Sequence, residues 1–256
     1  MKRSFVFFRK ELTELFRSGK LVLLGIIFIT FGIMNAGIAK LTPMIMDTYA
    51  DELAKTGMKI EKIEVDASTV WQQFFKNYSM MILVVVIMFA GIFAAEYTKG
   101  TLVLLITKGL PKSCVTGAKL LITELIWTCG YWLCFGVTYL YADIYWDNSI
   151  MEHLGFAVLL SYIFGIFLIA AMIFFGSFSG SMISVLLGTG VTYFLPTLLS
   201  MSNDLKKYMP TFLTGGMSLF TGENVPSDFT ASIAVTSVLT IFFIVGAFVC
   251  GRKKVN

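Results

Sequence analysis

The sequence Leu21-Val-Leu-Leu-Gly-Ile-Ile-Phe-Ile-Thr-Phe-Gly-Ile-Met-Asn-Ala-Gly-Ile-Ala39 decides the fold class of this chain. It runs for 19 residues without an ionisable side chain. At the rise of an α-helix, that length crosses the hydrocarbon core of a bilayer, which is about 30 Å thick. Unpaired backbone amides are too costly in lipid, so each such run must be helical. Five further runs make this an all-α integral membrane protein with six transmembrane helices: Tyr78–Ala95, Leu120–Tyr141, Leu154–Phe175, Met182–Leu199 and Ala231–Cys250.

The composition agrees with a membrane protein. Hydrophobic residues make up 57% and charged residues 14% of the 256 residues, values outside the usual range of soluble domains. The longest segments between the runs are residues 40–77, 96–119 and 201–230, and each is too short for an ordinary independent enzyme domain. We therefore expect one transmembrane domain over residues 1–256.

Lysine and arginine are distributed unevenly along the chain. If the N-terminus lies inside the cell, the inner segments hold 13 of the 20 basic residues and the outer segments hold seven. The positive-inside rule then predicts that both termini and the 96–119 loop are cytoplasmic, and that the 40–77 and 201–230 loops are extracellular. A cleaved signal peptide is the alternative interpretation of the start, but the first run is longer than an ordinary signal core and five runs follow it.

Residue types that commonly carry chemistry are few. The chain has a single histidine, His153, and four cysteines, of which Cys129, Cys134 and Cys250 lie inside spans and Cys114 lies in a cytoplasmic loop. No pair of cysteines is placed for an extracellular disulfide. One histidine without a second one nearby predicts no metal site.

The residues before the first span form an amphipathic pattern. We expect residues 1–20 to form a helix along the cytoplasmic interface, with its basic side chains near anionic head groups. This helix either anchors the topology only or acts as a lever that transmits motion from a cytoplasmic partner. The apolar positions are Phe5, Phe8, Leu12, Leu15 and Phe16, and the other side carries Arg9, Lys10, Glu11, Glu14 and Arg17.

The most specific segment is the loop that begins Glu96-Tyr-Thr-Lys-Gly-Thr-Leu-Val-Leu-Leu-Ile-Thr-Lys-Gly-Leu-Pro-Lys112. Gly100 permits a bend, and Thr101 can cap a short helix over Leu102–Thr107, which the following Gly and Pro end. A short apolar helix between charged ends, on the cytoplasmic face, needs a partner that buries it.

This order of residues, with Lys119 opening the third span, resembles the first cytoplasmic loop of the permeases of type-2 ATP-binding-cassette (ABC) transporters. The layout of most of the chain is also similar to that family: an interfacial helix, six spans, a long loop after the first span and a Gly-rich loop between the fifth and sixth. In the family, this loop is the coupling helix that docks into a cleft of the ATPase subunit. The resemblance implies a docking element made of Glu96, Lys99, Gly100, Thr101, Leu105 and Lys108.

The resemblance also implies the composition of a complex. This chain would be the permease subunit of an exporter in a bacterial plasma membrane, present as two copies or paired with a related permease. Two separate ATPase subunits would bind ATP and Mg²⁺, since this chain has no phosphate-binding loop of the type GxxxxGK[ST]. The chain itself would not be an enzyme, and we expect no cofactor and no nucleic-acid partner. One departure is Lys112, where the family commonly has arginine, because lysine lacks the bidentate geometry of a guanidinium.

In the resembled family, the second and fifth spans of two permeases face each other and line the transport path. Short re-entrant helices close the outer mouth in the loop that corresponds to residues 201–230. The lining would be apolar and rich in methionine, which suits hydrophobic or amphipathic cargo such as a toxic or antimicrobial peptide or a drug. The corresponding residues here are Met80, Met81, Val84, Met88, Phe89, Thr189, Thr192 and Tyr193.

Two other function classes remain open. An ion-coupled secondary transporter normally has broken helices and several polar groups within the membrane, and the Gly and Pro residues of the fifth span hint at this. Glu124, the one clear ionisable residue well inside a span, is either a proton or cation site or a structural carboxylate paired with Lys119 or Arg17. An intramembrane enzyme would need clustered His, Asp, Glu or Ser-Lys groups, which makes it the weakest alternative.

Overall fold

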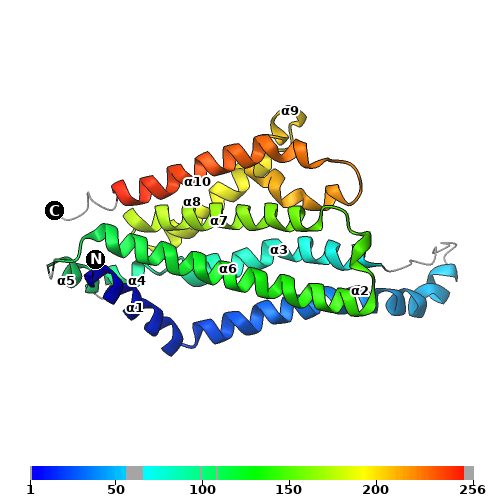
Figure 1. The fold of residues 1–256 in the computed structure, drawn as a ribbon, viewed down its shortest axis with the longest axis horizontal. Helices are drawn as coiled ribbons and strands as arrows, with labels where there is room; N and C mark the ends of the chain where they lie inside the picture. The colour runs from blue at the N-terminus through cyan, green and yellow to red at the C-terminus, as the bar shows by residue number, and fades with distance from the viewer. Residues whose placement is uncertain (1, 56–65, 99, 108, 251–256) are drawn as a thin grey trace.

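The computed structural model describes residues 2–55, 66–98, 100–107 and 109–250, and within them the chain forms helices and no strand. Its α-helices and 3-10 helices (η) follow one another along the sequence (Figure 1). Their bounds are α1 Lys2–Arg17, α2 Lys20–Lys55, α3 Ala67–Phe89, α4 Ala94–Thr98, α5 Thr101–Thr107, α6 Lys112–Tyr145, η1 Asn148–Ile150, α7 Leu154–Phe178, α8 Met182–Leu199, α9 Asn203–Lys206, η2 Pro210–Leu219, η3 Pro226–Phe229 and α10 Thr230–Cys250.

The six long helices are the predicted spans. Among the described residues, α2, α3, α6, α7, α8 and α10 are long and apolar enough to cross a membrane, and they lie side by side along the long axis of the molecule (Figure 1). The chain is therefore an all-α, multi-pass membrane protein. Helix α1 crosses one end of this bundle obliquely, at the same end as α4, α5 and the start of α6 (Figure 1). We call this end the α5 end.

Helix α7 is the central helix of the bundle, in contact with α6, α8, α10 and η2. In its most apolar stretch 67% of the residues are buried, compared with 11% in α8 and 17% in α10. Gly165 lets the Trp127 side chain of α6 pack against the backbone of α7, since a Cβ atom at position 165 would lie 2.3 Å from the indole. Helices α8 and α10 therefore lie at the periphery and expose most of their apolar side chains.

Aromatic side chains fill the contact between α3, α6 and α7. The ring of Trp127 lies 5.1 Å from that of Tyr131 and 6.0 Å from that of Tyr78, measured between centroids, and the contacts are edge-on or tilted. The Tyr131 hydroxyl donates a hydrogen bond to the Val158 carbonyl at 2.7 Å, so the polar end of this buried ring is satisfied. The aromatic cluster and this hydrogen bond thus join α3, α6 and α7.

Hydrogen bonds between side chains join α2 to its neighbours. The Asn35 amide donates to the Thr138 hydroxyl of α6 at 3.1 Å, and its carbonyl accepts from the Asn77 amide of α3 at 2.7 Å. The buried Asn35 thereby uses both ends of its side chain across helix contacts. Within lipid, the hydrophobic effect does not fix how two apolar helices face each other. Hydrogen bonds of this kind therefore add specificity to the contact between them.

The helix bounds differ from the predicted spans on both sides of the 40–77 loop. Helix α2 continues through Pro43 to Lys55, and α3 begins at Ala67 rather than Tyr78. The early start of α3 has a local cause, because the Asp66 carboxylate accepts a hydrogen bond from the Thr69 amide at 3.2 Å and caps the helix. Both helices therefore extend beyond their apolar runs into polar residues, and hydropathy alone does not detect such polar helix ends.

The second predicted span is also not one continuous helix. Residues 90–93 form turns, so the run expected to reach Ala95 divides into α3 and the short α4. In the 201–230 segment, η2 packs against α7 and buries Leu213 and Leu219. Short helical segments are present in this part of the chain, and η2 contributes to the core.

Replacement of Asn35 by Leu should lower the free energy of unfolding by about 1 kcal/mol, because Asn77 and Thr138 both lose a partner. Thermal unfolding of the purified protein in detergent measures the effect. Ile33→Ala, at an exposed position of the same helix, is the control and should change stability less. An Asn35→Leu protein as stable as the wild type would show that these bonds do not orient α2.

Candidate functional site

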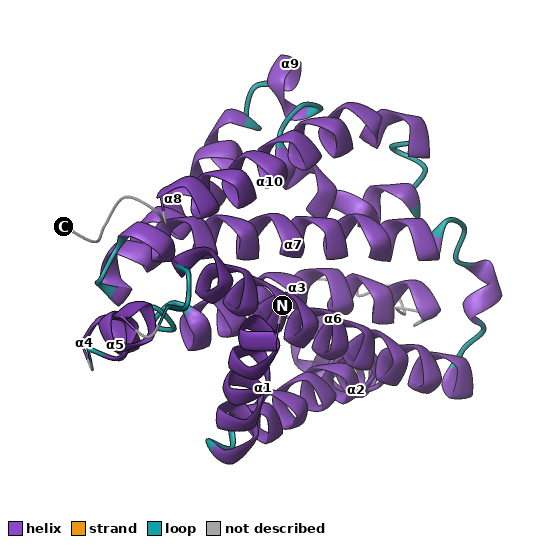
Figure 2. Ribbon diagram, turned by 60° about the vertical axis from the view of Figure 1, so that its left-hand side comes forward, coloured by secondary structure: helices purple, strands orange, loops and turns teal. Residues whose placement is uncertain are grey.

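The helix predicted in the 96–119 loop is present as α5, Thr101–Thr107. Gly100 and Gly109 flank it with φ angles of +66° and +81°, conformations that strain other residues, so two glycines set its direction. Figure 2 shows α4 and α5 lying together at the α5 end, apart from the long helices. The Thr101 hydroxyl donates a hydrogen bond to the Glu96 carbonyl at 3.4 Å and so ties α5 to α4.

A buried ion-pair network lies next to these short helices. The Lys119 ammonium of α6 lies 3.1 Å from a carboxylate oxygen of Glu96 in α4 and 3.4 Å from one of Glu11 in α1. Its side chain is 1% exposed and the two carboxylate side chains are each 10% exposed. We call Lys119, Glu96, Glu11 and Lys10 the Lys119 cluster, since Lys10 extends it by binding Glu11 at 2.8 Å. The cluster joins α1, α4 and α6.

Lys119 also stabilises the break between α3 and α4. Its ammonium donates a hydrogen bond at 3.1 Å to the carbonyl of Ile92, one of the turn residues between the two helices. A backbone carbonyl that a helix break leaves without a partner is costly away from water. One side chain therefore pairs with two carboxylates and also satisfies the broken backbone.

The other cation of the cluster is accessible to solvent. Lys10 is half exposed and binds Glu14 at 3.1 Å as well as Glu11. Its pKa lies above the ordinary value. Burial lowers the pKa of Lys10, but the hydrogen bonds and negative charges of Glu11 and Glu14 together raise it by more than burial lowers it. Lys10 therefore connects the solvent-accessible face of α1 to the buried part of the cluster.

A cleft of about 550 Å³ opens beside the cluster, between α1, the end of α3, α4 and the start of α8. Its wall is charged where the cluster lies and apolar elsewhere. The charged residues are Lys10, Glu11, Glu14, Lys20, Glu96 and Lys119, and the apolar ones include Leu15, Met88, Phe89, Ile92 and Met182. Such a wall suits an amphipathic molecule better than a small ion.

The predicted docking residues are placed unevenly. Glu96 is buried in the Lys119 cluster, Gly100 is exposed, and Thr101 is half buried. Lys99 and Lys108 lie outside the described residues, and Leu105 lies in α5 with its side chain outside them. The described apolar side chain that α5 exposes most is that of Leu104, at 55%.

The predicted path residues divide into two groups. Met81, Phe89 and Thr189 are buried within this chain, whereas the remaining five are exposed or partly exposed. A hydrogen bond of 3.2 Å between the hydroxyls of Ser79 and Tyr193 places α3 and α8 next to each other. Elsewhere α3 exposes Met80, Leu83 and Ile87, and α8 exposes Leu187, Val191 and Phe194.

The placement of two carboxylates differs from expectation. Glu11 was expected on the polar side of the N-terminal helix, but it is buried with Phe7 and Leu15, while Phe5 and Phe16 are exposed. The cause is Lys119, which α6 presents to this face of α1; a lysine at the start of a span was the one available signal.

Glu124 does not bind Lys119 or Arg17, and its Oε1 is buried without a hydrogen-bond partner among the described residues.

Comparisons with known proteins give no identification. No protein-family model, no curated protein and no solved structure matches this chain.

Replacement of Lys119 by Met should destabilise the protein strongly, by about 3–5 kcal/mol, because Glu96 and Glu11 would be buried without a cation. Thermal unfolding in detergent is the measurement, and Lys76→Met, at an exposed position of α3, is the matched control.

Adding Glu96→Gln and Glu11→Gln to the Lys119→Met protein should recover much of the lost stability, since no unpaired buried charge is left. If the triple variant stays as unstable as the single one, packing of the lysine side chain rather than its charge supports the contact.

Proposed function

We propose that this chain is the permease subunit of an ABC exporter that moves a hydrophobic or amphipathic substrate, most simply a toxic or antimicrobial peptide or a drug. Two ATPase subunits would bind ATP and Mg²⁺ and dock on α5. A second copy or a related permease would complete the path. In this assembly the α5 end faces the cytoplasm of a bacterial cell, as the distribution of basic residues predicts.

One observation carries this proposal: the exposed α5 is hydrogen-bonded to α4, and buried charge pairs join α4 to α6 and α6 to α1. The helix exposes Leu104, and a hydrogen bond from Thr101 ties it to the residue whose carboxylate binds Lys119. A force applied to α5 would therefore reach α4, α6 and α1 instead of being absorbed by a flexible loop. This is the mechanical property that a coupling element needs.

The periphery of the bundle supports the expected second permease and the cargo class. Helices α3 and α8 each expose large apolar side chains, and Lys76 is the one charged residue among the described residues of these two helices. Two such sides facing each other would form a path with apolar walls. A wall of this kind disfavours small ions, whose desolvation is expensive, and accepts apolar molecules of varied shape.

Ion-coupled transport is the second candidate, because one observation favours it. Glu124 lies well inside α6, and its Oε1 atom is buried without a hydrogen-bond partner among the described residues. Carboxylates within a span commonly bind protons or cations in transporters.

Replacement of Leu104 by Asp should prevent association with the ATPase subunit of the proposed complex, because burying a carboxylate in an apolar contact costs several kcal/mol. Co-purification from the membrane measures the association. Leu205→Asp, which alters an exposed leucine of α9, is the control and should leave the complex intact. Normal co-purification and transport by the Leu104→Asp protein would contradict docking on α5.

Replacement of Glu124 by Gln separates the two candidates. An ATP-driven exporter should keep its transport rate in proteoliposomes, since the glutamine preserves the shape of a side chain with no described ion-pair partner. Dissipation of the proton and sodium gradients should likewise have no effect. Transport that needs an ion gradient, and stops in the Glu124→Gln protein without ATP having any influence, would favour the second candidate.

A further inference from the structure

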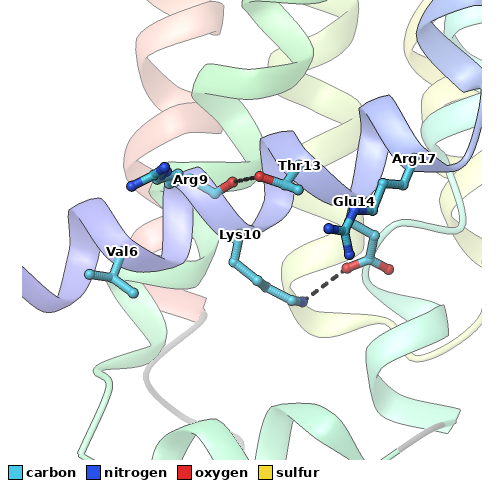
Figure 3. Close-up of a pocket in the computed structure, with 6 residues that line it drawn as sticks. All are labelled: Val6, Arg9, Lys10, Thr13, Glu14 and Arg17. Carbon is cyan, nitrogen blue, oxygen red and sulfur yellow. Dashed lines mark hydrogen bonds and ion pairs between the residues drawn. The ribbon is translucent and has the colours of Figure 1, made fainter.

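The exposed face of α1 carries a groove to which the Lys119 cluster contributes one residue, Lys10. The groove has a volume of about 510 Å³ and is lined by α1 alone (Figure 3). Its residues recur at the spacing of helical turns, so they share one face. They are Val6, Arg9, Lys10, Thr13, Glu14 and Arg17.

The charges in this groove are unbalanced. Glu14 is the single carboxylate among the six lining residues, and Lys10 binds it at 3.1 Å. Arg9 and Arg17 are exposed and form no ion pair with any residue that the structure describes. Two guanidinium groups, eight residues apart on one face, therefore have no ion-pair partner among the described residues, and guanidinium is well suited to phosphate.

Large apolar side chains accompany these arginines. Phe5, Val6 and Phe16 are 68%, 65% and 64% exposed. The helix lies at the end of the bundle, immediately before α2 begins its apolar run at Lys20. Exposed aromatic and basic residues on a helix that directly precedes a transmembrane span are typical of a helix that lies in the lipid head-group region.

We propose that this face of α1 binds acidic phospholipid, with Arg9 and Arg17 contacting the phosphate groups and Phe5 and Phe16 reaching the acyl boundary. A bilayer fits better than an acidic protein surface, because the exposed apolar side chains and the arginines are presented together next to a span. Each arginine near an anionic surface strengthens binding about fivefold, so the two together contribute about 30-fold.

Bound lipid would affect the Lys119 cluster directly. Lys10 lines the groove and also binds Glu11, whose other oxygen binds Lys119. A head-group phosphate attracts Lys10 away from Glu11 and so weakens one contact of the cluster. Acidic lipid thereby regulates how firmly α1 is attached to α6 and α4. Lipid binding requires no ATPase, so its failure would leave the proposed function standing.

Native mass spectrometry of the full chain in a neutral detergent tests this inference. The probes are phosphatidylglycerol and phosphatidylcholine with identical acyl chains, and glycerol phosphate as the free head group. The wild type should prefer phosphatidylglycerol, and the Arg9→Gln, Arg17→Gln double variant should bind it about 30-fold more weakly. Lys206→Gln with Lys207→Gln, at exposed lysines of α9 and its end, is the matched control and should keep the wild-type affinity.

Two single variants test the signs of the charges. Glu14→Gln should bind phosphatidylglycerol more tightly than the wild type, because it removes the groove's carboxylate and releases Lys10. Lys10→Gln should lose less affinity than Arg9→Gln or Arg17→Gln, because Lys10 is already held by two carboxylates. These variants alter exposed or half-exposed groups, and their unfolding temperatures confirm that each is folded.

Several results would overturn the inference. Equal binding of the two lipids would exclude recognition of an acidic head group, and equal binding of glycerol phosphate would exclude a lipid surface. Equal losses in the Arg9, Arg17 and the Lys206, Lys207 double variants would show non-specific attraction to any basic residue. Weaker binding by Glu14→Gln would exclude the groove even if the double variant did not fold.

Discussion

The bundle depends on one interaction at the α5 end: the Lys119 ammonium held between the carboxylates of Glu96 and Glu11. A charge that is 1% exposed is tolerable only if opposite charges and hydrogen bonds surround it. Once Lys119 is buried at the start of α6, it therefore requires α1 and α4 to lie against it. The same ammonium satisfies the Ile92 carbonyl, so the break between α3 and α4 depends on it as well.

This arrangement concentrates attachment at one end of the molecule. Along the bundle, α7 and the aromatic contacts of α3 and α6 form a packed interior, whereas α8 and α10 expose most of their apolar residues. These exposed apolar side chains are available for contact with lipid or with another subunit. A transport subunit with a rigid interior, an exposed side and a coupled end fits the proposed function.

The Lys119 cluster also joins two surfaces that a partner could alter. On one side, Thr101 and Glu96 connect it to α5, the proposed ATPase contact. On the other, Lys10 connects it to the groove of α1 that we propose binds lipid. Because all these contacts involve the same few charges, binding at either surface would change the electrostatic interactions at the other.

The sequence by itself determined the six spans, the amphipathic helix before them and the short α5, because hydropathy over 18 or more residues and the Gly and Pro positions are local properties. It also singled out Glu96 and Lys119 as residues at span ends. Only the tertiary structure decided that Glu11 points inward, that the second span breaks before Ala95, and that Met81 and Phe89 lie inside the chain. The physical reason is that each of these depends on contacts across the bundle: Glu11 meets Lys119 across 108 positions of sequence, and no local pattern of charge or hydropathy records such a partner.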